Sequence, residues 1–303
     1  MHRVFFIFLV LFAATVSAQT RVIVPFPPGG GTDVVARVLF QNITERTGKL
    51  FLIENVSGAG GDIGRQRAMR DNVLLFSPNS LLISAHIEKL GFVPLDEFQA
   101  VVGVGAYPYL LTAHPSFRIN NVKQLRDLAR QHGTINIASA GTSGANHLII
   151  AALAKSVGFP VESIPHKGTP DAAMTTMSGL VPLMVSGIQG TEDLVVAGKL
   201  RALAVTTAKR HPGLPAVPTI QEMIKKPFDY PGWFGIVAPR RYPKSQQDDL
   251  AREVLISLKS AQIQRKLGEL GVTVWALGPR EFAIFLQEDD HRWAVAVQNQ
   301  TSP

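Results

Sequence analysis

The chain has 303 residues, of which 46% are hydrophobic and 17% are charged, a composition typical of one or two folded globular domains. It has no cysteine, which excludes disulfides, thiolate zinc sites, iron–sulfur clusters and cysteine nucleophiles. The formal net charge of +7 weakly favours anionic small molecules, and the scattered basic residues, without aromatic residues between them, do not indicate nucleic acid.

Residues 1–18 have the pattern of a secretory signal peptide. Arg3 supplies a positive charge, residues 4–14 form an apolar core, and Val16-Ser17-Ala18 offers the small residues that signal peptidase requires. The apolar core is too short to span a bilayer comfortably, which argues against a membrane anchor. We therefore expect cleavage after Ala18 and export of a soluble protein.

A strand–turn–helix pattern opens the exported chain. Apolar residues 22–24 predict a buried strand, Pro27-Pro28 ends it, and Gly29–Gly31 allows a tight turn that a ligand can approach. Thr32 and Asp33 then suit the first turn of a helix. The N-terminus of such a helix directs unpaired N–H groups and a positive dipole end at one point, so we expect an anion there. The Gly-Lys-Ser/Thr ending of a phosphate loop is missing and Asp33 would repel phosphates, which favours a small carboxylate.

Beyond this turn, strand-like apolar runs alternate with segments of helical periodicity. Strands are expected at residues 50–54, 73–76, 100–112, 135–138, 161–164, 181–185, 200–206 and 233–239. Helices are expected at residues 122–131, 147–157, 169–178, 191–197, 246–260, 261–270 and 279–298, with another ending at residue 69. The repeated β–turn–α units predict an α/β fold of mostly parallel sheets with helices on both faces.

Two glycine-rich stretches are similar to enzyme motifs without matching them. Gly58, Gly60 and Gly64 follow a strand, but their spacing differs from that of a dinucleotide-binding turn, so no nicotinamide cofactor is expected. Residues 141–145 differ by one residue from a nucleophile elbow, which leaves an exported serine hydrolase using Ser143 as an alternative.

No pair of histidines has metal-ligand spacing, so neither a metal nor another cofactor is expected. The charged run Glu288-Asp289-Asp290, with Arg292, is interpreted as a solvated helix face.

The glycine turns at residues 29–32 and 141–145 are both strand–turn–helix junctions, and they lie in different halves of the chain. Ligands of parallel α/β sheets bind at the carboxyl ends of strands, where both turns must lie. Two helix N-termini facing each other across a cleft between domains could hold both carboxylates of a diacid, or one carboxylate alone.

The same stretches resemble a known family. Val24-Pro-Phe-Pro-Pro-Gly-Gly-Gly-Thr-Asp33 with Arg37, and Glu54-Asn-Val-Ser-Gly-Ala-Gly-Gly61, are similar to signatures of the tripartite tricarboxylate transporter receptors, the Bug family of periplasmic solute-binding proteins. The resemblance extends over the exported chain through His147-Leu148, Pro165–Gly168, Gly198–Val205, Leu214–Glu222 and Glu288–Trp293.

The resemblance implies a two-lobed fold of the type II periplasmic-binding-protein class, which closes on its ligand as a Venus flytrap. Lobe 1 would comprise residues 19–114 and 236–303 and lobe 2 residues 115–235, with chain crossings near Thr112–Pro115 and Trp233–Pro239. It also implies a monomeric, periplasmic bacterial receptor that is not an enzyme. Such a receptor delivers a small carboxylate or amino acid to the membrane permease subunits of a tripartite tricarboxylate-type transporter.

In that family the ligand meets main-chain amides and hydroxyl groups of turns from both lobes. Carried onto this sequence, the expected ligand-binding residues are Phe26, Pro28, Gly29, Gly30, Gly31, Thr32, Asp33, Ser80, Gly141, Thr142, Ser143, Gly144, Ala145, His166 and Ser186.

Three of these positions depart from the family pattern. His166 stands where the family has tyrosine, which introduces a group that is charged near neutral pH in some environments. Ser143-Gly144 stands where the family has Gly-Ser. The usual ligands of the family therefore do not transfer directly, and a ligand sensor for a membrane kinase with the same fold remains an alternative.

Overall fold

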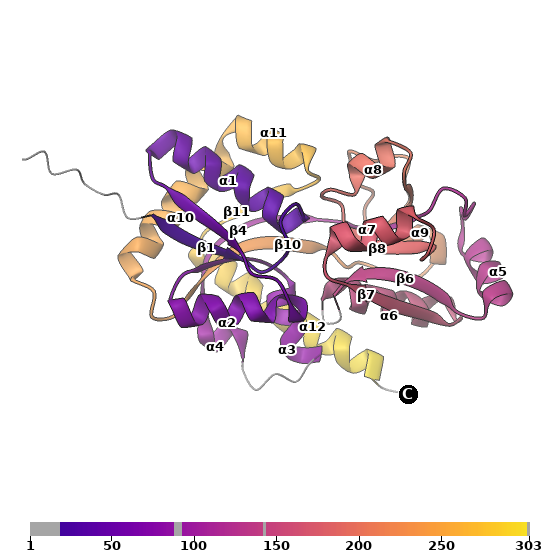
Figure 1. The fold of residues 1–303 in the computed structure, drawn as a ribbon. Coiled ribbons are helices and arrows are strands. Elements are labelled where there is room, and N and C mark those ends of the chain that lie inside the picture. Colours follow the sequence, from indigo (N-terminus) through magenta and orange to yellow (C-terminus); the bar gives the residue numbers. More distant parts are fainter. Residues whose placement is uncertain (1–18, 88–92, 142–143, 302–303) are drawn as a thin grey trace, which may run out of the picture.

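The computed structural model describes residues 19–87, 93–141 and 144–301. Figure 1 shows two lobes side by side, each built around one β-sheet. The predicted two-lobed α/β architecture is therefore confirmed. The predicted signal peptide and the expected site residues Thr142 and Ser143 lie outside the described residues.

The first sheet has six strands in the order β11-β4-β10-β3-β1-β2. The strands β1, β2 and β3 are parallel, whereas β10, β4 and β11 pair antiparallel. Their bounds are β1 (Thr20–Val24), β2 (Phe51–Asn55), β3 (Leu74–Pro78), β4 (Phe98–Tyr107), β10 (Gly232–Pro239) and β11 (Thr273–Leu277).

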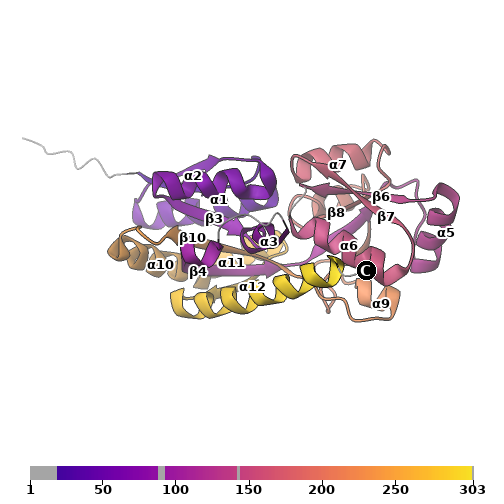
Figure 2. The ribbon, with the colours of Figure 1, turned by 90° about the horizontal axis from the view of Figure 1, so that it is seen from below.

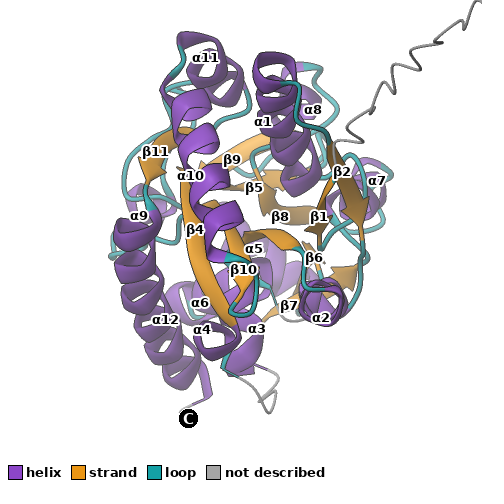
Figure 3. Ribbon diagram, turned by 90° about the vertical axis from the view of Figure 1, so that its left-hand side faces the viewer, coloured by secondary structure: helices purple, strands orange, loops and turns teal. Residues whose placement is uncertain are grey.

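Helices cover both faces of this sheet, and β1 is therefore buried on both sides. Val22 and Val24 pack into one core with α1, α10 and α11, whereas Ile23 packs into another with α2, α3 and α12 (Figure 3). The bounds are α1 (Gly31–Thr47), α2 (Asp62–Asp71), α3 (Ser80–Ile87), α10 (Lys244–Lys259), α11 (Ala261–Glu269) and α12 (Pro279–Thr301). Val22, Ile23 and Val24 point to alternate faces because successive side chains of a strand lie on opposite sides of the sheet. Two short elements, a 3-10 turn (Ala59–Gly61) and α4 (Pro94–Glu97), complete this lobe.

The second sheet has five strands in the order β7-β6-β8-β5-β9. Here β6, β7 and β8 are parallel, and β5 pairs antiparallel with β8 and β9. The strand bounds are β5 (Tyr109–Ala113), β6 (Ile135–Ala140), β7 (Val161–His166), β8 (Leu183–Gly187) and β9 (Arg201–Val205). The helix bounds are α5 (Val122–His132), α6 (Ala145–Val157), α7 (Thr169–Met177), α8 (Glu192–Val196) and α9 (Ile220–Ile224).

Both sheets are mixed, which corrects the expectation of mostly parallel sheets. The parallel strands belong to the local β–turn–α units that the sequence pattern reveals. The antiparallel strands β4, β5 and β10 flank the points where the chain passes from one lobe to the other, and their direction depends on distant pairing.

The first crossing lies at Pro108, earlier than the predicted Thr112–Pro115. Residues 100–112 were expected to form one strand, but Tyr107 ends β4 in the first sheet and Tyr109 begins β5 in the second. Proline interrupts the ladder because it has no N–H to donate. The chain returns between β9 and Gly232, so the whole of β10 belongs to the first sheet. The full extents of the two lobes stay a prediction.

The last helix, α12, lies along the first lobe, and its C-terminal end reaches the second lobe (Figure 2). It packs against β4 and α3 of the first lobe and reaches α6 of the second. Asp289 on this helix is 2% exposed, which corrects its interpretation as solvated. One of its carboxylate oxygens accepts hydrogen bonds from the indole N–H groups of Trp233 (2.6 Å) and Trp293 (3.0 Å), while Arg292 pairs with the other. Burial is the main cause of the raised pKa of Asp289.

Within the described part of the chain, no helix is both long and apolar enough to cross a membrane.

Candidate ligand-binding site

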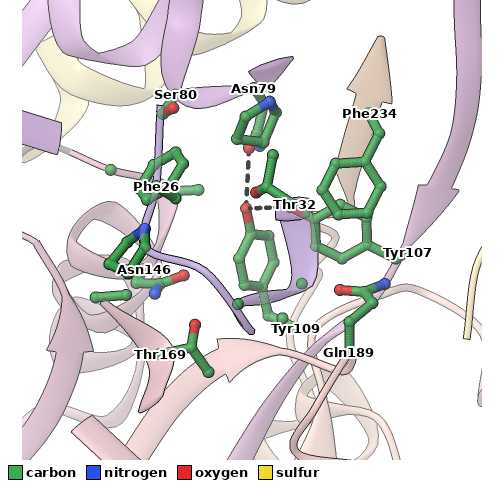
Figure 4. Close-up of a pocket in the computed structure, with 18 residues that line it drawn as sticks. Phe26, Thr32, Asn79, Ser80, Tyr107, Tyr109, Asn146, Thr169, Gln189 and Phe234 are labelled. Atoms are coloured by element: carbon green, nitrogen blue, oxygen red, sulfur yellow. Dashed lines mark hydrogen bonds between the residues drawn. The ribbon is translucent and has the colours of Figure 1, made fainter. Parts of the chain in front are cut away.

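A cavity of about 70 Å³ lies between the two lobes, which is room for several water-sized groups. Figure 4 shows side chains from both lobes around it. We call this cavity the inner chamber.

Four helices begin at the inner chamber. Gly31 opens α1 and Ser80 opens α3 in the first lobe, whereas Ala145 opens α6 and Thr169 opens α7 in the second, and all four residues line the cavity. The first turn of a helix leaves its N–H groups without intrahelical partners, and the helix dipole places a partial positive charge there. The chamber is therefore suited to negative charge.

The turn before α1 is held in place by Asp33, which does not line the chamber. Its carboxylate accepts hydrogen bonds from the Gly29 N–H, Arg37 Nε and Asn55 Nδ2, each 2.9 Å away. Asn55 also donates to the Phe26 carbonyl at 3.0 Å. Burial acts to raise the pKa of Asp33, but these hydrogen bonds outweigh it and the pKa is lowered. Asp33 is therefore an ionised anchor of the turn and leaves the ligand side of the turn to the backbone.

Two side-chain amides of the inner chamber have a nitrogen without a hydrogen-bond partner. They are Nδ2 of Asn79 in the first lobe and Nε2 of Gln189 in the second, on residues that are 1% and 2% exposed. A buried donor without a partner costs free energy, so such groups are expected where a ligand supplies the acceptor.

Aromatic residues at the chain crossing form one wall of the chamber (Figure 4). Tyr107 stacks on Phe234 with ring centroids 4.4 Å apart, and its hydroxyl lies 3.3 Å from that of Tyr109. The Tyr109 hydroxyl donates to Asn79 Oδ1 at 2.9 Å. Burial raises the pKa of both tyrosines, so both hydroxyls stay protonated and keep their donors.

A larger cavity of about 620 Å³, the outer chamber, shares Phe26 and Ala140 with the inner chamber. Residues 57–61 of the first lobe line one part of it. The second lobe contributes Gly141, Pro165, His166, Lys167 and Asp171.

The two lobes touch across the cleft at glycines. A Cβ added to Gly168 would lie 2.9 Å from Pro27 Cγ, and one added to Gly31 would lie 2.8 Å from Gln189 Cβ. Contacts this short leave no room for a side chain, so these positions set how closely the lobes approach each other.

The expected site residues divide into four groups. Seven of them line the inner chamber: Phe26, Gly30, Gly31, Thr32, Ser80, Gly144 and Ala145. Gly141 and His166 line the outer chamber only. Four residues line neither chamber: Pro28, Gly29, Asp33 and Ser186. Pro28 and Gly29 are exposed at the turn, which Asp33 anchors. The Ser186 hydroxyl is buried and lies 2.8 Å from Thr191 Oγ1, with which it shares a hydrogen bond. Thr142 and Ser143 lie outside the described residues.

Several lining residues were missed by reasoning from the sequence. They are Asn79, Tyr107, Tyr109, Asn146, Thr169, Gln189 and Phe234. Asn79 and Gln189 follow the buried strands β3 and β8 closely, and a polar residue just past the carboxyl end of a strand is the signal that points to them. The pair of tyrosines around Pro108 has no comparable local signal.

Among the described residues, no group of three or more His, Cys, Asp or Glu side chains could hold a metal ion.

Comparison with known proteins identifies what this arrangement is similar to. The model of the tripartite tricarboxylate transporter family receptor matches residues 35–301. The structure of the periplasmic binding protein BugD superposes with a TM-score of 0.87 at 29% identity, over 93% of this chain and 97% of BugD.

Two further structures of similar proteins contain small dicarboxylates. R. palustris Rpa4515 with adipate has a TM-score of 0.88 at 26% identity, over 93% of this chain and 97% of that protein. MatC from Rhodopseudomonas palustris with bound malate has a TM-score of 0.86 at 27% identity, over 92% and 99%. The family match covers most of the sequence, and the chain therefore belongs to the tripartite tricarboxylate transporter receptors, the Bug family of solute-binding proteins.

Proposed function

We propose that this chain is a periplasmic receptor that captures a small carboxylate between its lobes and delivers it to a tripartite tricarboxylate-type membrane transporter. The inner chamber carries the proposal: four helix N-termini meet there, and none of the described residues that line it has a charged side chain. Unpaired N–H groups and helix dipoles stabilise an anion without a counter-charge from lysine or arginine.

The unpartnered amides add to this argument because they come from different lobes. A carboxylate accepts several hydrogen bonds, so one carboxylate group can satisfy Asn79 from the first lobe and Gln189 from the second. A ligand that contacts both lobes stabilises the closed arrangement over an open one, because in the open one it keeps only the contacts to one lobe. Capture and closure are then a single process.

The relatives support the same ligand class and location. The structures with adipate and malate contain small carboxylates, and BugD is a periplasmic binding protein. The signal-peptide pattern of residues 1–18 fits export, and we expect the exported receptor to be a monomer.

The family match argues against one of the two alternative functions, the hydrolase, but not against the other, the sensor. Proteins of this family bind solutes and are not enzymes, so a hydrolase using Ser143 is not proposed. A sensor that passes the ligand signal to a membrane kinase would use the same cleft. It differs only in its partner, so a pull-down of permease subunits by the ligand-loaded protein separates the two.

Isothermal titration of the exported protein with small mono- and dicarboxylates tests the proposal. We expect saturable binding of at least one carboxylate, and loss of that binding in Gly30→Asp. Gly30→Asn is the matched control, because Asp and Asn have the same size and both favour the helix N-cap that Gly30 occupies. The proposal is wrong if no carboxylate binds, or if Gly30→Asp binds one as well as Gly30→Asn does.

A further inference from the structure

Three large hydrophobic side chains of the second lobe are exposed to solvent. Leu180 (81% exposed), Val196 (79%) and Met174 (60%) are the most exposed large hydrophobic residues in the described part of the chain. Single exposed hydrophobic residues are common on protein surfaces, but a group of them marks a site of contact.

The three residues adjoin one small hydrophobic core. Leu180 directly precedes Val181, and Val196 directly follows Val195. Val181 and Val195 both pack into that core, together with the end of α7, the helix that carries Met174. The three exposed side chains therefore belong to one surface, which we call the apolar tip.

The sheet topology places the apolar tip away from the cleft. Leu183 and Arg201, the first residues of β8 and β9, both pair with Ala113, the last residue of β5. The opposite ends of β5 and β8, at Tyr109 and Gly187, line the inner chamber. The tip residues precede β8 and β9 in the chain, so they lie at the far end of the sheet.

This end of the lobe is also basic. Figure 1 shows α5 at the end of the second lobe farthest from the first lobe. The exposed basic side chains on α5 and on the segments beside β5 and β9 include Arg118, Arg126, Arg130 and Lys199. Asp127, Glu162 and Asp193 offset part of this charge.

The basic character holds for the second lobe as a whole. Residues 115–235 contain twelve Lys or Arg residues and seven Asp or Glu residues. The rest of the exported chain contains seventeen and sixteen. The net positive charge of the receptor is therefore concentrated in the lobe that carries the apolar tip.

We propose that the far end of the second lobe binds the surface of a lipid bilayer that contains anionic lipids. The basic side chains are attracted to the headgroups, and Leu180, Val196 and Met174 enter the layer between headgroups and acyl chains. Charge complementarity selects this partner, because an anionic bilayer offers negative charge directly above an apolar layer. This surface lies outside the cleft, so a receptor bound in this way keeps its cleft open to ligand.

Flotation of the exported protein with lipid vesicles tests the proposal. Vesicles of phosphatidylcholine alone are compared with vesicles that contain about 40% phosphatidylglycerol, without any carboxylate ligand. At about 0.1 M salt we expect about fivefold more protein on the anionic vesicles, and loss of most of this difference at about 1 M salt.

Two double variants separate the apolar and the charged contributions. Leu180→Gln/Val196→Gln should weaken binding to anionic vesicles about fivefold, and Arg118→Gln/Lys199→Gln should weaken it about tenfold. All four positions are exposed and line neither chamber, so carboxylate binding and the melting temperature should stay unchanged in both variants.

Ile256→Gln/Lys259→Gln is the matched control, because it removes one exposed hydrophobic and one exposed basic side chain from α10 of the first lobe. It should bind anionic vesicles as the wild-type protein does. Since the chain has no cysteine, a polarity-sensitive dye can also be attached to Leu180→Cys or to Ile256→Cys. Anionic vesicles should shift the emission of the dye to the blue in the first variant only.

The proposal is overturned if the wild-type protein binds both kinds of vesicle equally or binds neither. It is also overturned if the control pair weakens binding as much as the tip pairs do, or if the dye shifts equally at both positions. A wild-type dimer that Leu180→Gln/Val196→Gln dissociates would assign the tip to contact between two copies instead. Failure of the proposed function is distinct, because the vesicle experiments contain no carboxylate ligand.

Discussion

The hydroxyl of Tyr109 donates a 2.9 Å hydrogen bond to Asn79 Oδ1, and this bond connects the two lobes. Tyr109 is the first residue of β5 in the second sheet, whereas Asn79 directly precedes α3 in the first lobe. With its oxygen held in this way, the Asn79 amide keeps its unpartnered Nδ2 at the inner chamber. The orientation of a donor proposed to bind the ligand thus depends on a residue at the chain crossing.

Tyr109→Phe should therefore weaken ligand binding as well as folding. The variant leaves Asn79 Oδ1 buried without a donor, which costs about 1–3 kcal/mol of unfolding free energy. We also expect about a tenfold loss of carboxylate affinity, because the Asn79 amide is free to rotate. Urea denaturation and calorimetric titration measure the two effects. Tyr242→Phe is the control, since Tyr242 lines neither chamber. Unchanged affinity in Tyr109→Phe would exclude a role for this bond in binding.

Gly168→Ala should hinder closure without harming the fold. The φ angle of Gly168 is 170°, an extended conformation that alanine adopts freely, but the new Cβ would lie 2.9 Å from Pro27 Cγ of the opposite lobe. The clash exists only when the lobes are together, so we expect carboxylate affinity to fall about tenfold. The unfolding free energy of the ligand-free protein should change by less than about 0.5 kcal/mol.

Gly268→Ala serves as the control for that experiment, because nothing lies within 4 Å of the added Cβ. Small-angle scattering with and without ligand gives an independent measurement. The wild-type protein and Gly268→Ala should contract on adding ligand, and Gly168→Ala should contract less. Equal contraction in all three proteins would show that Gly168 does not limit closure.

Arg21 should control the acid titration of the carboxylates beside it. It donates to Glu54 and to Asp71, and its hydrogen bond is the main cause that lowers the pKa of Asp71 to about 2. A carboxylate with a lowered pKa stabilises the fold fully above its unfolded pKa, and this stability is lost as the pH falls from about 4 to about 2.

In Arg21→Gln we expect the pKa of Asp71 to rise, and the loss of stability between pH 4 and pH 2 to become smaller. Carbon NMR of the carboxylates and melting temperatures across this range measure both. Arg67→Gln should raise the pKa of Asp71 less, because its hydrogen bond to Asp71 is a weaker cause of the shift. A larger rise in Arg67→Gln than in Arg21→Gln would contradict this assignment.

Asp289→Ala should destabilise the protein far more than Asp290→Ala does. The first variant leaves the buried indole N–H groups of Trp233 and Trp293 without their acceptor, and we expect a loss of about 3–5 kcal/mol. Asp290 bonds His86 at 2.8 Å and is about a quarter exposed, so its replacement should cost about 1 kcal/mol or less. Denaturant unfolding measures the loss of unfolding free energy in both variants. Equal losses in the two variants would mean that the indole contacts contribute little to stability.

The parts of the site that could be predicted are those formed by residues adjacent in the sequence, and the parts that depend on contacts between distant residues could not be predicted. The turn before α1 was predicted because the apolar strand, the prolines and the glycines that form it are adjacent in sequence. Asp33 was correctly placed in the first turn of α1, but its carboxylate meets Asn55, a partner from β2 that no local pattern reveals. The direction of β10 likewise depends on its pairing with β3 and β4.

The burial of Asp289 shows a signal that was present and overlooked. Phe282, Leu286 and Trp293 lie on the buried face of α12, and the spacing 282, 286, 289, 293 follows the repeat of a helix. The charged neighbours of Asp289 suggested a solvated position, but the helical periodicity places that one carboxylate inside. Its partners come from both α12 and β10, so the acceptor role could be read only from the structure.

On the proposed function, the inner chamber holds a carboxylate largely through main-chain N–H groups at the starts of four helices. Every residue other than proline carries the same N–H group, so a substitution at these positions that neither adds a negative charge nor fills the cleft leaves the means of holding a carboxylate in place. On the same proposal, selectivity depends on side chains such as Gln189, which can change one at a time. Descendants of one ancestral receptor can therefore diverge in ligand without passing through a form that has lost the ability to hold an acid.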